Sequence, residues 1–267
     1  MARQARMLSK TSIYHIMIRG SERQSIFIDE EDKIRFIDTL QTKLKISESK
    51  LFAYCLMDNH VHLLIGEGKE DIAKIMKRIN VSYALYFNRK YKRIGHLFQD
   101  RFKSEVIEND NYISEAVRYI HNNPVKASMV KAISDYRWSS YKNYLSDSKE
   151  FIVKETVLNM FSENREKAVI LFKEFSEKNS DIKFVEYNEM DEEEKRLKEE
   201  TKAKEIIKES LSRKNIFNDN YMENKQIRNE IILELREKGG FSIRRIAELL
   251  KINRGVVQKV VKEECDN

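Results

Sequence analysis

The segment that decides the fold of this chain is Asp58-Asn59-His60-Val61-His62-Leu63-Leu64-Ile65. The apolar residues 51–57 precede it, and a two-residue turn signal between two apolar runs predicts a β-hairpin. Side chains on a strand alternate between faces, so His60 and His62 point the same way. Two imidazoles at this spacing form half of a divalent-metal site, but the pair is equally compatible with hydrogen-bonded core histidines.

The length and composition of the chain are typical of an ordered, helix-rich protein with one large core or two domains. It has 267 residues, of which 35% are charged, with seven Gly and one Pro. We expect no membrane partner, because no apolar run approaches the roughly 20 residues of a membrane span. Cys55 and Cys265 form no disulfide framework, which favours a cytoplasmic location. The net charge of +6 is compatible with a polyanionic partner.

Hydrophobic periodicity predicts the order β-α-β-β-α-β with a further helix appended. The expected elements are a strand at 12–19, a helix at 29–45, the histidine hairpin, a helix at 71–91, a strand at 101–107 and a helix from 111 to about 122. This order predicts an α+β domain with a ferredoxin-like antiparallel sheet covered by helices on one face.

A basic segment, residues 88–103, lies between the second expected helix and the last expected strand. Six Lys and Arg stand there against one acid, Asp100, with Tyr91, Phe98 and Phe102 among them. Cations for phosphates beside aromatic rings for bases are the combination that binds single-stranded nucleic acid. The alternative for Phe98 and Phe102 is that they pack in the core.

The appended helix carries candidate catalytic residues. Tyr119 and Asn123 are four residues apart, so they share a face of a helix. A phenol can attack an electrophile, and an amide oxygen one turn later can be a third ligand for a hard cation. We expect Pro124 to end the helix and to bias Asn123 away from the helical conformation. Tyr112 is a competing nucleophile, and for either tyrosine the alternative is a half-buried packing role.

Several segments together resemble the single-tyrosine HUH transposases, and most closely the REP-associated tyrosine transposases. These segments are residues 14–20, 57–64, 95–103, 118–127 and 138–141, and the resemblance covers roughly residues 10–145. It implies that His60 and His62 bind the metal, that Tyr119 is the nucleophile, and that Asn123 supplies a further ligand where relatives often have Gln. Asp58 stands where many relatives have Pro, which affects the turn and not the chemistry.

The resemblance implies an enzyme that uses Mg²⁺ or Mn²⁺ to cleave single-stranded DNA near hairpins and to transfer strands through a 5′-phosphotyrosine. The residues that we expect to contact DNA are Arg19, Arg89, Lys90, Lys92, Arg93, Arg101 and Lys103 in the catalytic domain, and Arg254, Gln258 and Lys259 near the C-terminus.

Residues 224–264 resemble a helix-turn-helix unit. Ser242 and Asn253 are candidate caps for helices at 243–250 and 254–262, and Lys251 stands where Gly is common in the turn. The second helix would face duplex DNA in the major groove, whereas the alternative is a three-helix bundle used for dimerisation. The predicted domains are the HUH domain at 1–146, a charged helical connector at 147–222 and the helix-turn-helix domain at 223–267.

Two other functions compete with the transposase. One is a catalytically degenerate DNA-binding regulator that works through the helix-turn-helix, and the other is a nickase of the relaxase or replication-initiator type. The presence of His60, His62, Tyr119 and Asn123 argues against decay. Relaxases and initiators usually carry further His or paired Tyr motifs. A homodimer is left open.

Overall fold

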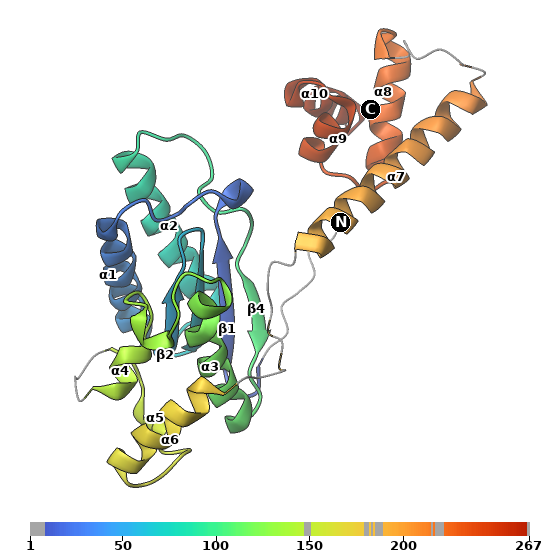
Figure 1. The fold of residues 1–267 in the computed structure, drawn as a ribbon. Helices are drawn as coiled ribbons and strands as arrows, with labels where there is room; N and C mark the ends of the chain where they lie inside the picture. The colour runs from blue at the N-terminus through green and yellow to red at the C-terminus, as the bar shows by residue number, and fades with distance from the viewer. Residues whose placement is uncertain are drawn as a thin grey trace. The chain divides into compact units, whose positions relative to one another are not determined.

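The computed structural model describes residues 9–146, 151–178, 182, 184, 189–214, 216 and 222–265 of the chain. They fall into two compact units, divided between residues 186 and 187. The larger unit holds the sheet (Figure 1). In chain order its elements are β1 (Ile13–Arg19), the 3-10 turn η1 (Ser21–Arg23), α1 (Glu30–Ser47), β2 (Lys50–Leu56), β3 (His60–Gly66), α2 (Ile72–Lys90), β4 (Lys103–Val106), α3 (Asp110–Lys126), the 3-10 turn η2 (Ile133–Asp135), α4 (Tyr141–Leu145), α5 (Glu155–Leu158) and α6 (Arg165–Glu177).

The four strands form one antiparallel sheet in the order β2-β3-β1-β4. Helix α1 connects β1 to β2 and helix α2 connects β3 to β4, which confirms the predicted α+β, ferredoxin-like arrangement. In this register His62 lies opposite Met17 and Cys55, and His60 lies opposite Arg19. Residues directly opposite each other on neighbouring strands share a face, so these five side chains lie on the same side of the sheet.

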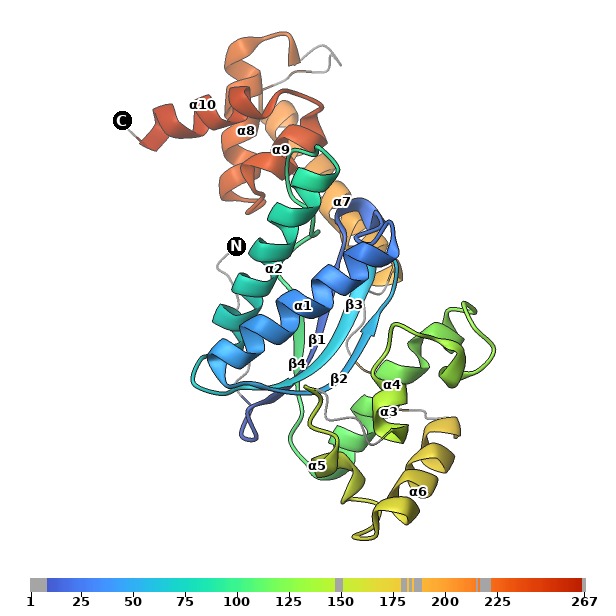
Figure 2. The ribbon, with the colours of Figure 1, turned by 90° about the vertical axis from the view of Figure 1, so that its left-hand side faces the viewer.

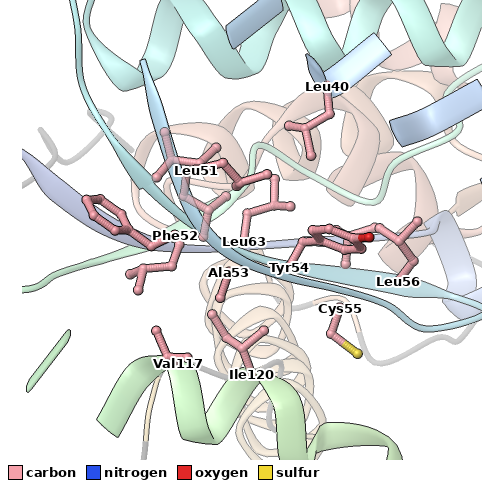
Figure 3. Close-up of a cluster of buried hydrophobic side chains, with 14 of the residues drawn as sticks. Leu40, Leu51, Phe52, Ala53, Tyr54, Cys55, Leu56, Leu63, Val117 and Ile120 are labelled. Atoms are coloured by element: carbon pink, nitrogen blue, oxygen red, sulfur yellow. The ribbon is translucent and has the colours of Figure 1, made fainter. Parts of the chain in front are cut away.

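The helices cover both faces of the sheet. The two crossover helices, α1 and α2, lie on one face as predicted, and the appended helix α3 lies on the other (Figure 2). Figure 3 shows Val117 and Ile120 of α3 beneath Ala53 and Cys55 of β2, with Leu40 of α1 on the opposite side. Helix α3 therefore covers the face that carries His60 and His62.

Helix α3 is longer than the sequence predicts. It runs from Asp110 to Lys126 with Pro124 inside its last turn, so the prediction that Pro124 ends the helix at about residue 122 is wrong. Proline costs about 3 kcal/mol in a helix interior. In a last turn it removes only one hydrogen bond, and the burial of Asn123 and Pro124 offsets that loss. Asn123 therefore stays helical, one turn after Tyr119 and on the same side.

The segment that follows α3 covers the β2 edge of the sheet. The backbone N–H of Leu56 donates to Trp138 O at 2.9 Å, and that of Ser140 donates to Tyr54 O at 3.0 Å. The Ser140 hydroxyl accepts from the Tyr54 N–H at 2.9 Å and lies 2.8 Å from Nε2 of His121 on α3. An uncovered edge strand can pair with other chains. This segment both covers the edge and ties α3 to it.

The smaller unit is helical in its described residues. Its elements are α7 (Glu189–Arg213), α8 (Lys225–Glu237), α9 (Ile243–Leu250) and α10 (Arg254–Cys265). Ile231, Ile246 and Val257, one from each of the last three helices, are fully buried in one apolar cluster. The two helices expected at 243–250 and 254–262 therefore pack together with α8.

Local capping in the smaller unit follows the sequence signals. The Ser242 hydroxyl accepts from the Arg245 N–H at 3.2 Å at the start of α9, and Asn253 Oδ1 accepts from the Gly255 N–H at 2.7 Å at the start of α10. Lys251 ends α9 in the left-handed conformation, with φ of 53°. Glycine is common at such positions because it has no Cβ, so Lys251 is a strained residue in this turn.

The predicted connector, residues 147–222, is divided between the two units. Val157 of α5 and Phe172 of α6 are fully buried in the core of the larger unit. Ala203 and Ile206 of α7 are buried in the cluster of the smaller unit. The described parts of this charged stretch therefore contribute to both cores. Within the described ranges, no helix is both long and apolar enough to cross a membrane.

Candidate metal and tyrosine site

The two histidines of β3 lie beside each other on the α3 side of the sheet. Their ring centroids are 5.1 Å apart with an interplanar angle of 83°, which confirms that they point the same way. Burial lowers the pKa of His60 to about 4, with the charge of Arg19 also lowering it and that of Asp58 opposing. Burial lowers the pKa of His62 well below its usual value, and neighbouring imidazoles add to this. Both rings are therefore neutral at pH 7 and offer lone pairs to a metal.

Each of the two rings has a partner on Nδ1. His60 Nδ1 lies 2.7 Å from Oδ1 of Asn59. An amide oxygen can only accept, so His60 carries its proton on Nδ1 and leaves Nε2 as a lone pair. His62 Nδ1 lies 3.1 Å from Nε2 of His15, a fully buried histidine on β1. No sequence pattern singles out His15, because its contact with His62 depends on the pairing of β1 with β3.

The structure brings Tyr119 to these histidines. Its ring meets His62 edge-on, with centroids 5.8 Å apart, and meets His15 at 5.6 Å. Lys126 Nζ lies 4.4 Å from the centroid of the Tyr119 ring. The tyrosine is 4% exposed, and the ring of Phe184 packs on it at 4.9 Å. Phe184 escaped prediction because it lies in the charged stretch at 147–222, where the sequence analysis predicts no site residues.

Tyr112, the competing nucleophile, is engaged by a carboxylate. Its hydroxyl donates to Oε1 of Glu105 on β4 at 2.5 Å. Burial raises the pKa of Tyr112 to about 12, and the hydrogen bond and charge of Glu105 act in the same direction. Its ring stacks on Phe184 at 4.8 Å. A phenol with a raised pKa beside an anion is a poorer nucleophile than one beside a cation.

Asn123 lies one helical turn after Tyr119 and is 8% exposed. Its Nδ2 donates to Tyr119 O at 3.0 Å, so Oδ1 is the atom left to bind a cation. Among the described residues, no cluster of three His, Cys, Asp or Glu side chains could hold a metal ion. The candidate donor set is instead two neutral imidazoles and an amide oxygen, a set that fits a divalent cation without any thiolate.

The basic segment between α2 and β4 presents several cations to solvent. Arg89, Lys92 and Arg101 are exposed. Arg93 is half-buried, with its guanidinium 5.7 Å from the centroid of the Phe87 ring. These positions are compatible with contact to a phosphate backbone.

Three other predicted DNA contacts, Lys90, Arg19 and Lys103, are less exposed. Lys90 forms ion pairs of 2.8 to 3.0 Å with carboxylates at the start of α1, so its charge is used within the protein. Arg19 is buried beside His60 on the site face, 7% exposed. Lys103 is half-buried on β4, opposite Met17. Lys90 is therefore a poor candidate for a phosphate contact.

In the smaller unit the predicted DNA-binding residues share one side of α10. Arg254, Gln258 and Lys259 are exposed, while Val257 and Val260 are buried. Lys259 makes an exposed ion pair of 3.8 Å with Glu263.

Comparisons with known proteins find similarity to transposases over part of the chain. Residues 9–123 match the family described as IS200-like transposases. A Haemophilus influenzae protein described as a REP-associated tyrosine transposase is 28% identical over 101 residues, which are 33% of this chain and 57% of the relative. Solved structures similar in fold include a REP-associated tyrosine transposase bound to a REP hairpin, at 20% identity and TM-score 0.47 over 55% of this chain and 87% of that one. Another is a Deinococcus radiodurans protein described as a transposase, at 20% identity and TM-score 0.33 over 45% of this chain and 96% of that one.

The match to the IS200-like transposase family covers residues 9–123 and lies within the larger unit. The chain spans 57% of the length of the curated relative that it matches. The matched region contains every residue of the candidate metal and tyrosine site except Lys126 and Phe184.

Proposed function

We propose that the larger unit cleaves single-stranded DNA beside a hairpin and transfers strands through a 5′-phosphotyrosine on Tyr119. The observation that carries this proposal is the edge contact of the Tyr119 ring with His62, 5.8 Å between centroids, next to the paired ring of His60. The phenol of Tyr119 on α3 lies there beside the two neutral imidazoles of β3. The similarity of residues 9–123 to IS200-like transposases supports the same reaction class.

In the proposed reaction Tyr119 Oη attacks the scissile phosphorus. The P–O3′ bond breaks, the upstream strand leaves with a 3′ hydroxyl, and the downstream strand is joined to the tyrosine through its 5′ phosphate. The bond between the DNA and the tyrosine is a phosphodiester, like the DNA bond that was broken. The 3′ hydroxyl of another strand can therefore reverse the step without a nucleotide cofactor. An unperturbed phenol ionises at about pH 10, and the positive charge of Lys126, 4.4 Å from the ring centroid, favours its phenolate.

His60 through Nε2, His62, and Asn123 through Oδ1 would hold a divalent cation, Mn²⁺ or Mg²⁺. Imidazole nitrogen suits the later transition metals and amide oxygen suits Mg²⁺ and Mn²⁺, so the mixed donor set favours Mn²⁺ of the two. A cation bound there would polarise the phosphoryl oxygens and stabilise the charge that builds during in-line attack. The low pKa of both histidines keeps them available as ligands at neutral pH.

The exposed cations Arg89, Lys92 and Arg101 would contact the backbone of the single-stranded flank. A hairpin is the first substrate to test, because the solved REP-associated relative is described as bound to one. The smaller unit would bind duplex DNA through Arg254, Gln258 and Lys259 on α10, which face solvent together.

The test is covalent capture of DNA by the protein. Synthetic hairpins with single-stranded flanks, copied from the DNA beside the gene and labelled at the 3′ end, are incubated with Mn²⁺ and run on a denaturing gel. The proposal predicts a labelled protein band that is absent with EDTA and absent in Tyr119→Phe. Tyr112→Phe is the matched control and keeps the band. A 5′ label should instead appear in a shortened strand that ends in a 3′ hydroxyl.

Loss of the band in Tyr112→Phe, with retention in Tyr119→Phe, contradicts the assignment of the nucleophile. Binding of hairpin or duplex DNA without any covalent band, in the presence of Mn²⁺, favours a DNA-binding regulator. The exposed basic side of α10 is the observation on which that second function rests.

A further inference from the structure

His15 is the buried histidine that neither the sequence patterns nor the proposed reaction uses. It lies on β1, is 1% exposed, and faces the same side of the sheet as His62. The two rings are nearly parallel, with centroids 5.3 Å apart and an interplanar angle of 9°. His15 Nε2 and His62 Nδ1 are 3.1 Å apart, which is a hydrogen bond between two imidazoles.

We propose that His15 is a positioning residue whose Nε2 accepts a hydrogen bond from Nδ1–H of His62 and so leaves Nε2 of His62 free to bind the cation. This inference rests on the proposed metal site. A neutral imidazole has one N–H and one lone pair, and the partner of one nitrogen determines which nitrogen carries the proton. The opposite direction of the bond would put the proton on Nε2 of His62 and prevent that atom from binding a metal.

The second histidine of the site is arranged in the same way. His60 Nδ1 donates to Oδ1 of Asn59 at 2.7 Å, so its Nε2 is also a lone pair. Metal-binding histidines are generally oriented by an acceptor on the other ring nitrogen. With His15 as the acceptor for His62, both rings offer the same atom to one cation.

An imidazole suits this buried position better than the more usual carboxylate acceptor. The position is almost fully buried, and its ring neighbours include Tyr119 at 5.6 Å and Phe184 at 5.5 Å. An ionised carboxylate there would lack compensating donors, whereas a neutral ring can accept a hydrogen bond without charge.

Burying His15 costs free energy that an apolar residue at this position would not cost. Its Nδ1 is buried and has no hydrogen-bond partner among the described residues. With Nε2 as the acceptor, this unpartnered nitrogen carries the proton, and such a buried donor costs about 1–3 kcal/mol. An aliphatic residue would avoid that cost. The hydrogen bond that His15 accepts from His62 explains why a histidine stands there.

The test measures binding of Mn²⁺ alone, by titration calorimetry on the full chain without DNA. We expect His15→Leu to weaken Mn²⁺ binding by about 10- to 100-fold, the usual effect of losing an orienting partner. His15→Gln should stay within about threefold of the wild type, because Oε1 can reach the place of Nε2 and only accepts there. Tyr144→Phe is the matched control: it removes a buried hydrogen bond to Phe52 O, 2.7 Å long, without touching the histidines of the site.

A second measurement needs no substitution. Long-range ¹H–¹⁵N correlation of the histidine rings in the wild type should show His62 protonated on Nδ1, and protonation on Nε2 overturns the inference. Wild-type Mn²⁺ affinity in a folded His15→Leu variant overturns it as well.

Failure of the inference and failure of the proposed function give different results. If His62→Ala abolishes Mn²⁺ binding and His15→Leu weakens it, but no DNA adduct forms, the positioning role stands and the proposed reaction fails. If the adduct forms and His15→Leu binds Mn²⁺ like the wild type, the reaction stands and the positioning role fails.

Discussion

At the scale of single residues, the contact between Lys126 and the ring of Tyr119 bears directly on the proposed reaction. The lysine ammonium lies 4.4 Å from the centroid of the tyrosine ring, and Lys126 stands about two helical turns further along α3. A fixed positive charge beside a phenol stabilises its anion, which is the attacking form of the group.

We therefore expect Lys126→Gln to slow adduct formation about tenfold, equivalent to about 1.4 kcal/mol of reduced stabilisation. Lys126→Arg, which keeps the charge, should retain most of the rate. The measurement is single-turnover adduct formation at saturating Mn²⁺ and hairpin. Lys131→Gln, at an exposed position just beyond α3, is the control. Equal rates in Lys126→Gln and Lys131→Gln would contradict a role for Lys126.

Residues with a local pattern were predictable, and residues that depend on pairing across the sheet were not. The side-by-side rings of His60 and His62 follow from the alternation of a strand. The contact of His15 with His62 needs the register of β1 against β3, which no single segment specifies. Lys90 was assigned to DNA because it lies in a basic run, and its carboxylate partners on α1 are about sixty residues away in the sequence.

Among the elements, α3 depends on a small polar cluster for its position. Ser140 Oγ accepts from the Tyr54 N–H at 2.9 Å and pairs with Nε2 of His121 at 2.8 Å, so one hydroxyl joins the sheet edge to the helix. All three residues are buried, and an unpaired polar group there costs about 1–3 kcal/mol.

Ser140→Ala should lower the free energy of unfolding by about 2–3 kcal/mol, because it leaves two buried groups without a partner. Ser139→Ala is the control: that hydroxyl accepts one long bond of 3.4 Å from Tyr141 N and should cost less than about 1 kcal/mol. Urea unfolding followed by circular dichroism measures both. Equal losses in the two variants would show that the Ser140 cluster does not hold α3.

The junction of α1 and α2 is held by Asp32, whose side chain is fully buried beside Lys90. Burial alone raises the pKa of Asp32, but hydrogen bonds from Ile28 N–H, Lys90 and Tyr91 outweigh it and leave the pKa below its ordinary value of 3.8. A carboxyl with a lowered folded-state pKa stabilises the fold fully above its ordinary pKa, and the contribution is lost as the pH falls through the folded-state pKa.

Asp32→Asn should therefore lower the free energy of unfolding by about 2–3 kcal/mol at pH 7, because it leaves Lys90 with a weakened set of partners. The difference in free energy of unfolding between Asp32→Asn and the wild type should shrink as the pH falls below 3.8, because the wild-type carboxyl then takes up a proton. Glu31→Gln, at a side chain 72% exposed, is the control and should change little. If that difference in free energy of unfolding stays constant from pH 7 to pH 3, the ionised carboxylate of Asp32 does not stabilise the junction of α1 and α2.

Strands and helices were largely predictable because their apolar spacing is regular, and the errors have specific causes. Pro124 misled the prediction of where α3 ends, since burial of the last turn outweighed the local preference of proline. Helix α3 lies on the histidine face, and residues 138–140 cover β2. The sequence pattern of neither segment could predict this, because both placements depend on tertiary packing.

For the whole molecule, average charge does not reveal which residues of the stretch at 147–222 are buried. High charge in residues 147–222 indicated a connector, yet Phe172 is fully buried in the larger core and Ala203 is buried in the smaller one. Few apolar residues suffice to bury one face of a helix, so average charge is a weak guide to packing.

The smaller unit gives a prediction that is independent of catalysis. In the full chain, Arg254→Ala with Lys259→Ala should weaken duplex binding and reduce the slope of log affinity against log salt by about two, because two phosphates are then no longer neutralised by the protein. Adduct formation on a short hairpin should be unaffected. Lys225→Ala, at an exposed position on α8, is the control. Unchanged duplex binding in the double variant would favour a role for these helices in dimerisation.

The most direct test of the account identifies the amino acid that carries the DNA. The Mn²⁺-dependent adduct is digested with nuclease and protease, and the peptide bearing the residual nucleotide is sequenced by mass spectrometry. The account predicts a 5′-phosphate ester on Tyr119, within the peptide that also contains His121 and Asn123. A nucleotide on Tyr112, or on any residue outside α3, would contradict it.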